Sequence, residues 1–407
     1  MMYKSVSFSS FASADVDVEA WRTKIDVPVF SRAGKTKGAI TFKRRPIIVA
    51  LIFIICFLSF SYYTTHPAPT MGGQHTEVQI LQKVTSYNTT YPLTRPIVTS
   101  QGMTMRIGMI TDMDVSSRSG NKTYEWRSYI RYGWLSFNNR TLSISIKWEQ
   151  DDVDAVEIVS GYSNHGRGME MSEMVVFDGK VLVVDDRTGI VYHVIGNRIA
   201  PWVILSDGDG TKAKGFKGEW MTIKDETLIV GAAGKEWTTR HGVFMHRDPQ
   251  WVKTIDKYGA VRHFDWTTNY RSMQRASGHL SPGYIIHESC AWSKIHNAWF
   301  FLPRRVSSLR YNDVLDQQRG GNILFKCNHD FTSVQVITIG DTTHRERGYS
   351  SFKFIPGTND GVIVALKTVE LNARTQTYVT SFTLEGNILL PDTLVSDNYK
   401  FEGFEFL

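Results

Sequence analysis

The chain has 407 residues, of which 42% are hydrophobic and 12% aromatic, and its formal net charge at pH 7 is +6. This composition is typical of a folded globular protein rather than a disordered one, and the length suits one large domain or two ordinary ones. Part of the positive charge lies in residues 35–45, just before an apolar run, so the net charge does not indicate a nucleic-acid-binding protein.

An apolar run early in the chain predicts a membrane anchor. Residues 46–63 read PIIVALIFIICFLSFSYY, carry no charge and are long enough to span a bilayer. Three basic residues at 43–45 precede the run directly, which favours a cytosolic N-terminus and a lumenal remainder. We therefore expect a cytosolic tail at 1–45 and a type II signal anchor at 46–64. A cleaved signal peptide or a buried core helix is the alternative.

The segment after the predicted anchor is expected to be a lumenal stem. Residues 65–101 contain Pro, Gly and Thr without any periodicity. Three N-glycosylation sequons begin at Asn88, Asn121 and Asn139, all on the side predicted to be lumenal. Together with the anchor they predict a protein of the Golgi or endoplasmic reticulum membrane.

Residues 102–407 predict an all-β domain built from a repeat. Short runs rich in Val, Ile, Phe, Tyr and Trp alternate with Gly, Asp and Asn turns, and no convincing long amphipathic helix is seen. One unit recurs about every 45 to 70 residues: an acidic or hydroxyl residue, a strand, a tight turn, a second strand and a charged end. Five such starts predict a five-bladed β-propeller. They are Ser172-Glu173, Glu219-Trp220, Glu288-Ser289, Ser350-Ser351 and Glu402-Gly403.

The last unit has one strand, because the chain ends after it. A strand without a unit of its own lies at residues 105–110, followed by Asp112 and Asp114. If the two pair, the last blade is completed by the first strand of the domain and the ring closes. Closure would remove the exposed sheet edges that make β proteins prone to association.

The starts of the five units are expected to meet near the propeller axis. In an antiparallel hairpin the start of the first strand and the end of the second lie at the same end. Carboxylates gathered there repel one another unless a cation lies among them, and oxygen donors suit calcium better than zinc. Structural hydrogen bonds between blades are the alternative role. The converging residues are Ser172, Glu173, Glu219, Glu288, Ser350 and Glu402.

The charged ends of the units add cations to the same face. Arg304 and Arg305 offer planar donors that match phosphate oxygens, and Lys235 adds a point charge. Trp237 offers a surface on which a nucleobase could stack. An anionic aromatic ligand such as a nucleotide would fit this set.

Several long stretches of the chain, in the right order, resemble the calcium-activated nucleotidases of the apyrase family. They include RIGMITDMD, GRGMEMSEMVVFDGK, KGFKGEWMTIKDE, WFFLPRR and FEGFEFL. The resemblance implies a five-bladed propeller with calcium in its central channel, held by the six converging residues. It also implies nucleotide contacts at Asp112, Asp114, Arg187, Lys235, Glu236, Trp237 and Arg304.

The expected activity is calcium-dependent hydrolysis of nucleoside diphosphates to a monophosphate and phosphate. UDP and GDP are the expected substrates in the secretory pathway, with ADP and triphosphates left open. We expect Asp114 to orient or deprotonate the attacking water, with Asp186 as the alternative base. A non-enzymatic propeller stabilised by calcium is the rival hypothesis, and a phosphodiesterase acting on nucleotide sugars is a third.

Some features stay open at the level of sequence. Cys290 and Cys327 are the cysteines outside the apolar run, and they could pair in an oxidising compartment. Whether two copies associate into a homodimer, and whether the stem is cut to release the domain outside the cell, is undetermined.

Overall fold

The computed structural model describes residues 54–58, 61, 86–120, 122–149, 155–341, 343–372 and 374–407. The predicted cytosolic tail, most of the predicted anchor, much of the predicted stem and Asn121 lie outside these residues. Residues 84–407 form one compact unit. In the described part of the chain, no helix combines the length and the apolar character needed to cross a membrane.

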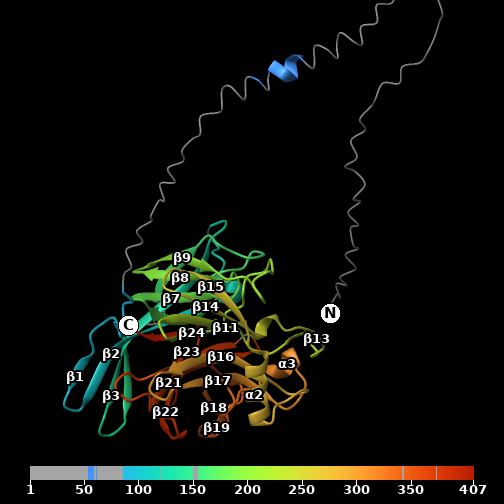
Figure 1. The fold of residues 1–407 in the computed structure, drawn as a ribbon. Coiled ribbons are helices and arrows are strands. Elements are labelled where there is room, and N and C mark those ends of the chain that lie inside the picture. Colours follow the sequence, from blue (N-terminus) through green and yellow to red (C-terminus); the bar gives the residue numbers. More distant parts are fainter. Residues whose placement is uncertain are drawn as a thin grey trace, which may run out of the picture. The chain divides into compact units, whose positions relative to one another are not determined.

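The compact unit is a five-bladed β-propeller, which confirms the predicted fold (Figure 1). In four blades the strands run in chain order from the channel outward. The second blade comprises β6 (Met171–Phe177), β7 (Lys180–Asp185), β8 (Ile190–Ile195) and β9 (Arg198–Ile204). The third comprises β10 (Trp220–Lys224), β11 (Thr227–Gly231), β14 (Trp251–Ile255) and β15 (Val261–Asp265). The fourth comprises β16 (Tyr284–Ser293), β17 (Ala298–Ser307), β18 (Ile323–Asn328) and β19 (Val334–Thr338). The fifth comprises β20 (Arg347–Phe354), β21 (Val362–Leu371), β22 (Arg374–Thr383) and β23 (Ile388–Ser396).

The first blade joins the two ends of the propeller domain, as the sequence predicts. Its innermost strand is the C-terminal one, which pairs antiparallel with the first long strand so that Met109 lies opposite Phe404 and Ile107 opposite Phe406. The ring is therefore closed by backbone hydrogen bonds, with no free edge at the junction. The blade comprises β24 (Lys400–Phe406), β2 (Gly102–Asp112), β3 (Trp126–Asn138) and β4 (Ile144–Trp148), with β1 (Ile97–Thr99) on β2 and β5 (Val156–Ser160) on β3.

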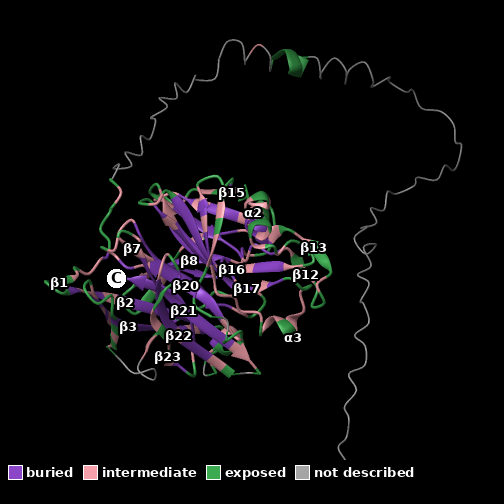
Figure 2. Ribbon diagram, turned by 90° about the horizontal axis from the view of Figure 1, so that it is seen from below, coloured by how far each residue is buried: buried purple, intermediate pink, exposed green. Residues whose placement is uncertain are grey.

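The apolar core lies between the blades. Each neighbouring pair of blades shares one cluster of buried side chains, for example Val175 and Phe177 of β6 with Met221 of β10 and Leu228 of β11. Figure 2 shows the buried residues concentrated along the strands of the propeller. Because each blade buries both of its faces, the strands read as nearly continuous apolar runs, and the polar residues stand out at their ends.

Tight turns hold the predicted hairpins. Asp178 and Gly179 both have positive φ angles, of 49° and 72°, between β6 and β7. Two successive left-handed residues form the turn that matches the twist of paired strands, and Asp-Gly is a favoured pair for it. This local geometry fixes the register of the second blade.

Part of the segment assigned to the stem packs against the propeller. The Asn88 amide donates to Asp178 Oδ1 at 2.8 Å, and the Tyr91 hydroxyl donates to Glu405 Oε1 at 2.8 Å. Strand β1 follows at Ile97–Thr99. Short polar and aromatic residues without periodicity carry no signal for such contacts, because the partners lie far away in the chain.

Three smaller elements interrupt the blades. Helix α2 (Thr267–Ser277) follows β15, although the sequence showed no convincing amphipathic helix; only Tyr270 and Met273 of it are buried. The hairpin of β12 (Trp237–Thr238) and β13 (Phe244–His246) and the single turn α3 (Asp313–Asp316) lie in loops of the third and fourth blades. They meet where the Asp313 amide donates to the Arg240 carbonyl at 3.1 Å.

The two cysteines of the propeller do not form a disulfide. Cys290 on β16 and Cys327 on β18 are both buried free thiols, and strand β17 lies between their strands. Burial raises the pKa of the Cys327 thiol to about 12, so it stays protonated. Both side chains act as small apolar core residues.

Candidate active site

Four of the five predicted hairpins start at an irregularity of an innermost strand. Ser172, Ser350 and Glu402 are each skipped in the pairing register, where two residues of one strand face one residue of the next. Glu288 and its neighbour Ser289 are skipped in the same way. A β-bulge turns a side chain away from the regular alternation of its strand. Of the bulged residues, Glu288 and Glu402 line the cavity described next. Glu219 directly precedes β10 and needs no bulge.

These irregularities border a polar cavity of about 510 Å³ at the start of the innermost strands. Among the described residues that line it are ten carboxylate and six lysine or arginine side chains, so the formal charge of the lining is −4. Of the predicted metal ligands, Glu219, Glu288 and Glu402 line it. The prediction that acidic residues from several blades converge at one end is therefore matched by the structure.

The predicted ligand Glu173 points elsewhere. Its Oε1 accepts hydrogen bonds from the Ser351 hydroxyl and the Met174 amide, both at 2.9 Å, and lies 3.2 Å from Lys353 Nζ. Ser172 is the extra residue of the bulge, whereas Glu173 resumes the regular pairing opposite Val184. Burial raises the pKa of Glu173 to about 7.

The predicted ligand carboxylates are held by cations from other strands. Arg304 Nη1 donates to Glu402 at 2.6 Å and also to Glu288, and its Nη2 donates to Glu370 at 2.6 Å. Lys217 Nζ lies 3.0 Å from Glu219. Burial raises the pKa of Glu219 and Glu288, and that of Glu402 to about 7, although these cations oppose the shift.

The donor set fits a hard cation. The Ser172 hydroxyl is 2% exposed and has no hydrogen-bond partner among the described residues, and the Ser350 hydroxyl reaches only the Phe401 carbonyl at 3.4 Å. Buried polar atoms without partners are rare in proteins and need an explanation. Hydroxyl and carboxylate oxygens from five strands, without nitrogen or sulfur, suit calcium.

The predicted base Asp114 belongs to a second acidic group beside this ring. Asp114 follows β2 and begins the short helix η2 (Asp114–Ser117), and its side chain is 46% exposed. Lys400 Nζ lies 2.9 Å from Asp114 and 2.7 Å from Asp112. Asp186, the alternative base, is 7% exposed and paired with Lys217. Asp114 is thus the carboxylate with better access to water.

The two predicted arginines differ in what they can still bind. Arg304 donates to three carboxylates, whereas the nearest carboxylate to Arg305 is Asp316, at 3.7 Å from its Nε. Arg305 is 3% exposed and lines the cavity. Arg187 also lines it, and its Nε has no hydrogen-bond partner in the described chain. Arg305 and Arg187 are therefore the guanidinium groups with donors available for an anion.

Lys235, Glu236 and Trp237 lie at the rim rather than in the cavity lining. Lys235 Nζ donates to Thr238 Oγ1 at 2.8 Å and to the Glu236 carbonyl at 2.9 Å, and burial lowers its pKa to about 8. The Trp237 ring is 40% exposed and stacks on His246 with the planes 16° apart. The hairpin that carries them contacts α3, which contributes Asp313 and Asp316 to the cavity.

Several cavity residues escaped the sequence interpretation. Lys217 and Lys400 each stand two residues before a predicted ligand, Glu219 and Glu402, and this Lys-x-Glu spacing could have revealed both. Four others belong to no predicted unit, and no motif in the sequence places them at the cavity. They are Arg167, Glu170, Asp316 and Glu370.

A closed propeller whose channel mouth combines oxygen donors with guanidinium groups defines a protein suited to binding a cation and a phosphorylated ligand together. A profile of the apyrase family matches residues 113–407. Soluble calcium-activated nucleotidase 1 of Mus musculus is 42% identical over 371 residues, covering 90% of this chain and 91% of that protein. Apyrase of Cimex lectularius is 39% identical over 360 residues, covering 88% and 95%. The chain belongs to the apyrase family and is thus a member of a family of nucleotide phosphohydrolases.

Proposed function

We propose that this protein is a calcium-dependent hydrolase that converts nucleoside diphosphates, UDP and GDP foremost, into a monophosphate and phosphate. The observation that carries the proposal is the cavity in which the bulged starts at Glu288 and Glu402 meet the guanidinium groups of Arg187 and Arg305. The names of the mouse relative and of the Cimex apyrase support the nucleotide and the calcium.

The calcium ion would be held by Ser172, Glu219, Glu288, Ser350 and Glu402. When bound, it supplies positive charge that offsets the charge of the phosphates. Arg304 links Glu288, Glu402 and Glu370 and so fixes two of these carboxylates in place. Its role is to position the ring, because its donors are already engaged.

The terminal phosphoryl group would be held by Arg305 and Arg187. Planar guanidinium groups donate two parallel hydrogen bonds to phosphate oxygens, and both groups have donors facing the cavity. Arg305 lies near Asp316, which accepts a hydrogen bond from the Tyr284 hydroxyl, and Arg319 in turn donates to that hydroxyl. Positioning and charge would supply most of the rate, as is usual for phosphoryl transfer.

Asp114 would orient the attacking water and accept its proton. Its carboxylate is half-exposed, unlike that of Asp186, and Lys400 and Arg167 hold its two oxygens at 2.9 Å and 3.4 Å. Water attack on the terminal phosphorus breaks the bond to the bridging oxygen and releases phosphate. The monophosphate leaves with that oxygen.

We place this activity in the Golgi or endoplasmic reticulum lumen, on the basis of the predicted anchor. Glycosyl transfer from nucleotide sugars releases UDP and GDP there, and their hydrolysis would remove inhibitory products. Trp237, at the rim, would stack on the base.

Phosphate release by the full-length chain tests the proposal, with UDP, GDP, ADP and UTP in calcium, magnesium or EDTA. We expect release from diphosphates that requires calcium, with UDP and GDP ahead of ADP. No release from any substrate, while calcium still raises the melting temperature, would favour a non-enzymatic binding propeller instead.

A further inference from the structure

The cavity holds more negative charge than one calcium ion can balance. Its lining carries a formal charge of −4, and a divalent cation on the central ring would leave −2. A nucleoside diphosphate brings about three more negative charges at neutral pH. Like charges at short range in a poorly hydrated cavity repel strongly, so the lining and the substrate together require further positive charge.

A close group of carboxylates lies beside the ring, where the first and second blades meet. Asp112 ends β2, Asp114 begins η2, and Glu170 precedes β6 and forms a β-bridge with Asp112. One carboxylate oxygen from each of these three residues lies within 4.8 Å of the others. Asp112 and Glu170 are buried, whereas Asp114 opens toward water.

Side-chain cations only partly neutralise this group. Lys400 Nζ is shared among Asp112, Asp114 and Glu370 at 2.7 to 2.9 Å, with Glu402 at 3.5 Å. Arg167 forms ion pairs with both Glu170 and Asp114. Each positive charge is thus divided between two or more carboxylates.

Asp186 has one carboxylate oxygen without a partner, although Lys217 holds the other. It lines the same cavity, is 7% exposed, and its Oδ1 has no hydrogen-bond partner among the described residues. Its amide donates to the Glu170 carbonyl at 3.0 Å, which fixes it next to the acidic group. Burial raises the pKa of both Asp112 and Glu170, and the charge of Asp186 adds to the shift. A buried carboxylate oxygen without a donor is costly unless a cation completes it.

We propose that Asp112, Asp114, Glu170 and Asp186 form a second divalent-cation site, separate from the central ring. Four carboxylates without nitrogen or sulfur ligands select a hard cation, either calcium or magnesium. The inference rests on the proposed function for its purpose: the second cation would supply part of the positive charge that the diphosphate requires.

Equilibrium dialysis of the full-length chain against radioactive calcium, from micromolar to millimolar, tests the proposal. We expect two sites per chain in the native protein. Glu170→Gln should weaken one site by about tenfold or more, because it removes a ligand charge, and should leave the other unchanged. Glu288→Gln should affect the other site. Glu157→Gln, the same change on an exposed strand residue outside the cavity, should alter neither.

Anomalous scattering from manganese-soaked crystals locates the ions without any variant. Peaks at the central ring and beside Glu170 would support the proposal. One site in the native protein, or a second peak away from these four residues, would overturn it, whatever the effect of Glu170→Gln on folding. A single site together with normal calcium-dependent phosphate release would overturn only the second site. No calcium binding at all would overturn the proposed calcium dependence as well.

Discussion

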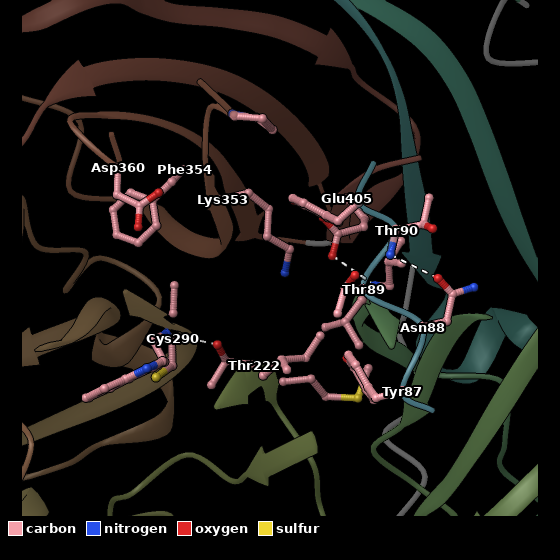
Figure 3. Close-up of a pocket in the computed structure, with 18 residues that line it drawn as sticks. Tyr87, Asn88, Thr89, Thr90, Thr222, Cys290, Lys353, Phe354, Asp360 and Glu405 are labelled. Atoms are coloured by element: carbon pink, nitrogen blue, oxygen red, sulfur yellow. Dashed lines mark hydrogen bonds between the residues drawn. The ribbon is translucent and has the colours of Figure 1, made fainter. Parts of the chain in front are cut away.

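The two ends of the propeller channel are built from the same five strands and yet differ in character. At the strand starts lies the polar cavity of about 510 Å³, and at the strand ends lies a second pocket of about 420 Å³ (Figure 3). Figure 3 shows Lys353 pointing into the second pocket, with Asn88, Thr89 and Thr90 along one side. Its walls are largely apolar.

The charged groups at the second end are neutralised within the protein. Glu405 accepts from the Tyr91 hydroxyl, the Phe406 amide and the Val176 amide, and Lys353 pairs with Glu173. Bulges at the strand starts turn extra polar side chains inward, whereas the strand ends keep regular pairing. Local irregularity of the backbone, rather than strand identity, separates the reactive end from the structural one.

The largest expected effect comes from a change at the reactive end. Asp114→Asn removes the proposed base, and turnover should fall by about 10²- to 10⁴-fold. Calcium binding at the central ring should stay nearly unchanged, because Asp114 lies outside that ring. Phosphate release and calorimetric calcium titration measure the two quantities. Loss of central calcium binding along with activity would instead give Asp114 a structural role.

Lys353→Met tests the structural end. The change leaves Glu173 buried without its cation, so the free energy of unfolding should fall by about 3 kcal/mol. Turnover of the folded protein should stay within about twofold of native, since Lys353 is remote from the cavity lining. Denaturant titration and phosphate release measure the two quantities. The control is Lys147→Met, the same substitution at an exposed position on β4. A large loss of turnover in the folded variant would break the distinction between the two ends.

Arg305→Gln tests whether Arg305 and Arg304 have different roles at the reactive end. It removes donors to the terminal phosphate, so kcat/KM for UDP should fall by about 10- to 100-fold. Calcium affinity should not change, whereas Arg304→Gln should alter it by releasing Glu288 and Glu402. Arg198→Gln, on the exposed side of β9, is the control. Equal effects of the two substitutions on calcium affinity would contradict the division of roles.

The smallest expected effect is on the pH dependence of the free energy of unfolding. His287 on β16 is fully buried, and burial lowers its pKa to about 3. In the unfolded chain His287 is protonated when the pH is below the ordinary histidine pKa of about 6.5, whereas in the folded protein it stays neutral. The free energy of unfolding therefore falls as the pH drops from 6.5 toward 3. The contribution approaches about 1.4 kcal/mol per pH unit. Unfolding titrations at pH 7.5 and 5.5 should show a smaller difference in His287→Gln than in the native protein.

Much of the fold was accessible to sequence reasoning because it depends on local patterns. Each repeated unit has a polar start, a strand, a tight turn such as Asp178-Gly179 and a second strand, always in this order. The unpaired strand at each end of the domain predicts that the ring of blades closes. The site was accessible only in outline. Glu170 and Arg167 become part of it through the bridge between Asp112 and Glu170, which joins residues 58 positions apart in the chain.

The sequence by itself determined the number of blades, the closure of the ring and the end of the channel at which acidic residues gather, because strand periodicity and turn residues are local properties. Only the tertiary structure decided which carboxylate faces the cavity, which arginine keeps free donors and which charges lack a partner. Those properties depend on bulges and on side chains from other blades, and pairing across blades is set by packing in space rather than by spacing along the chain.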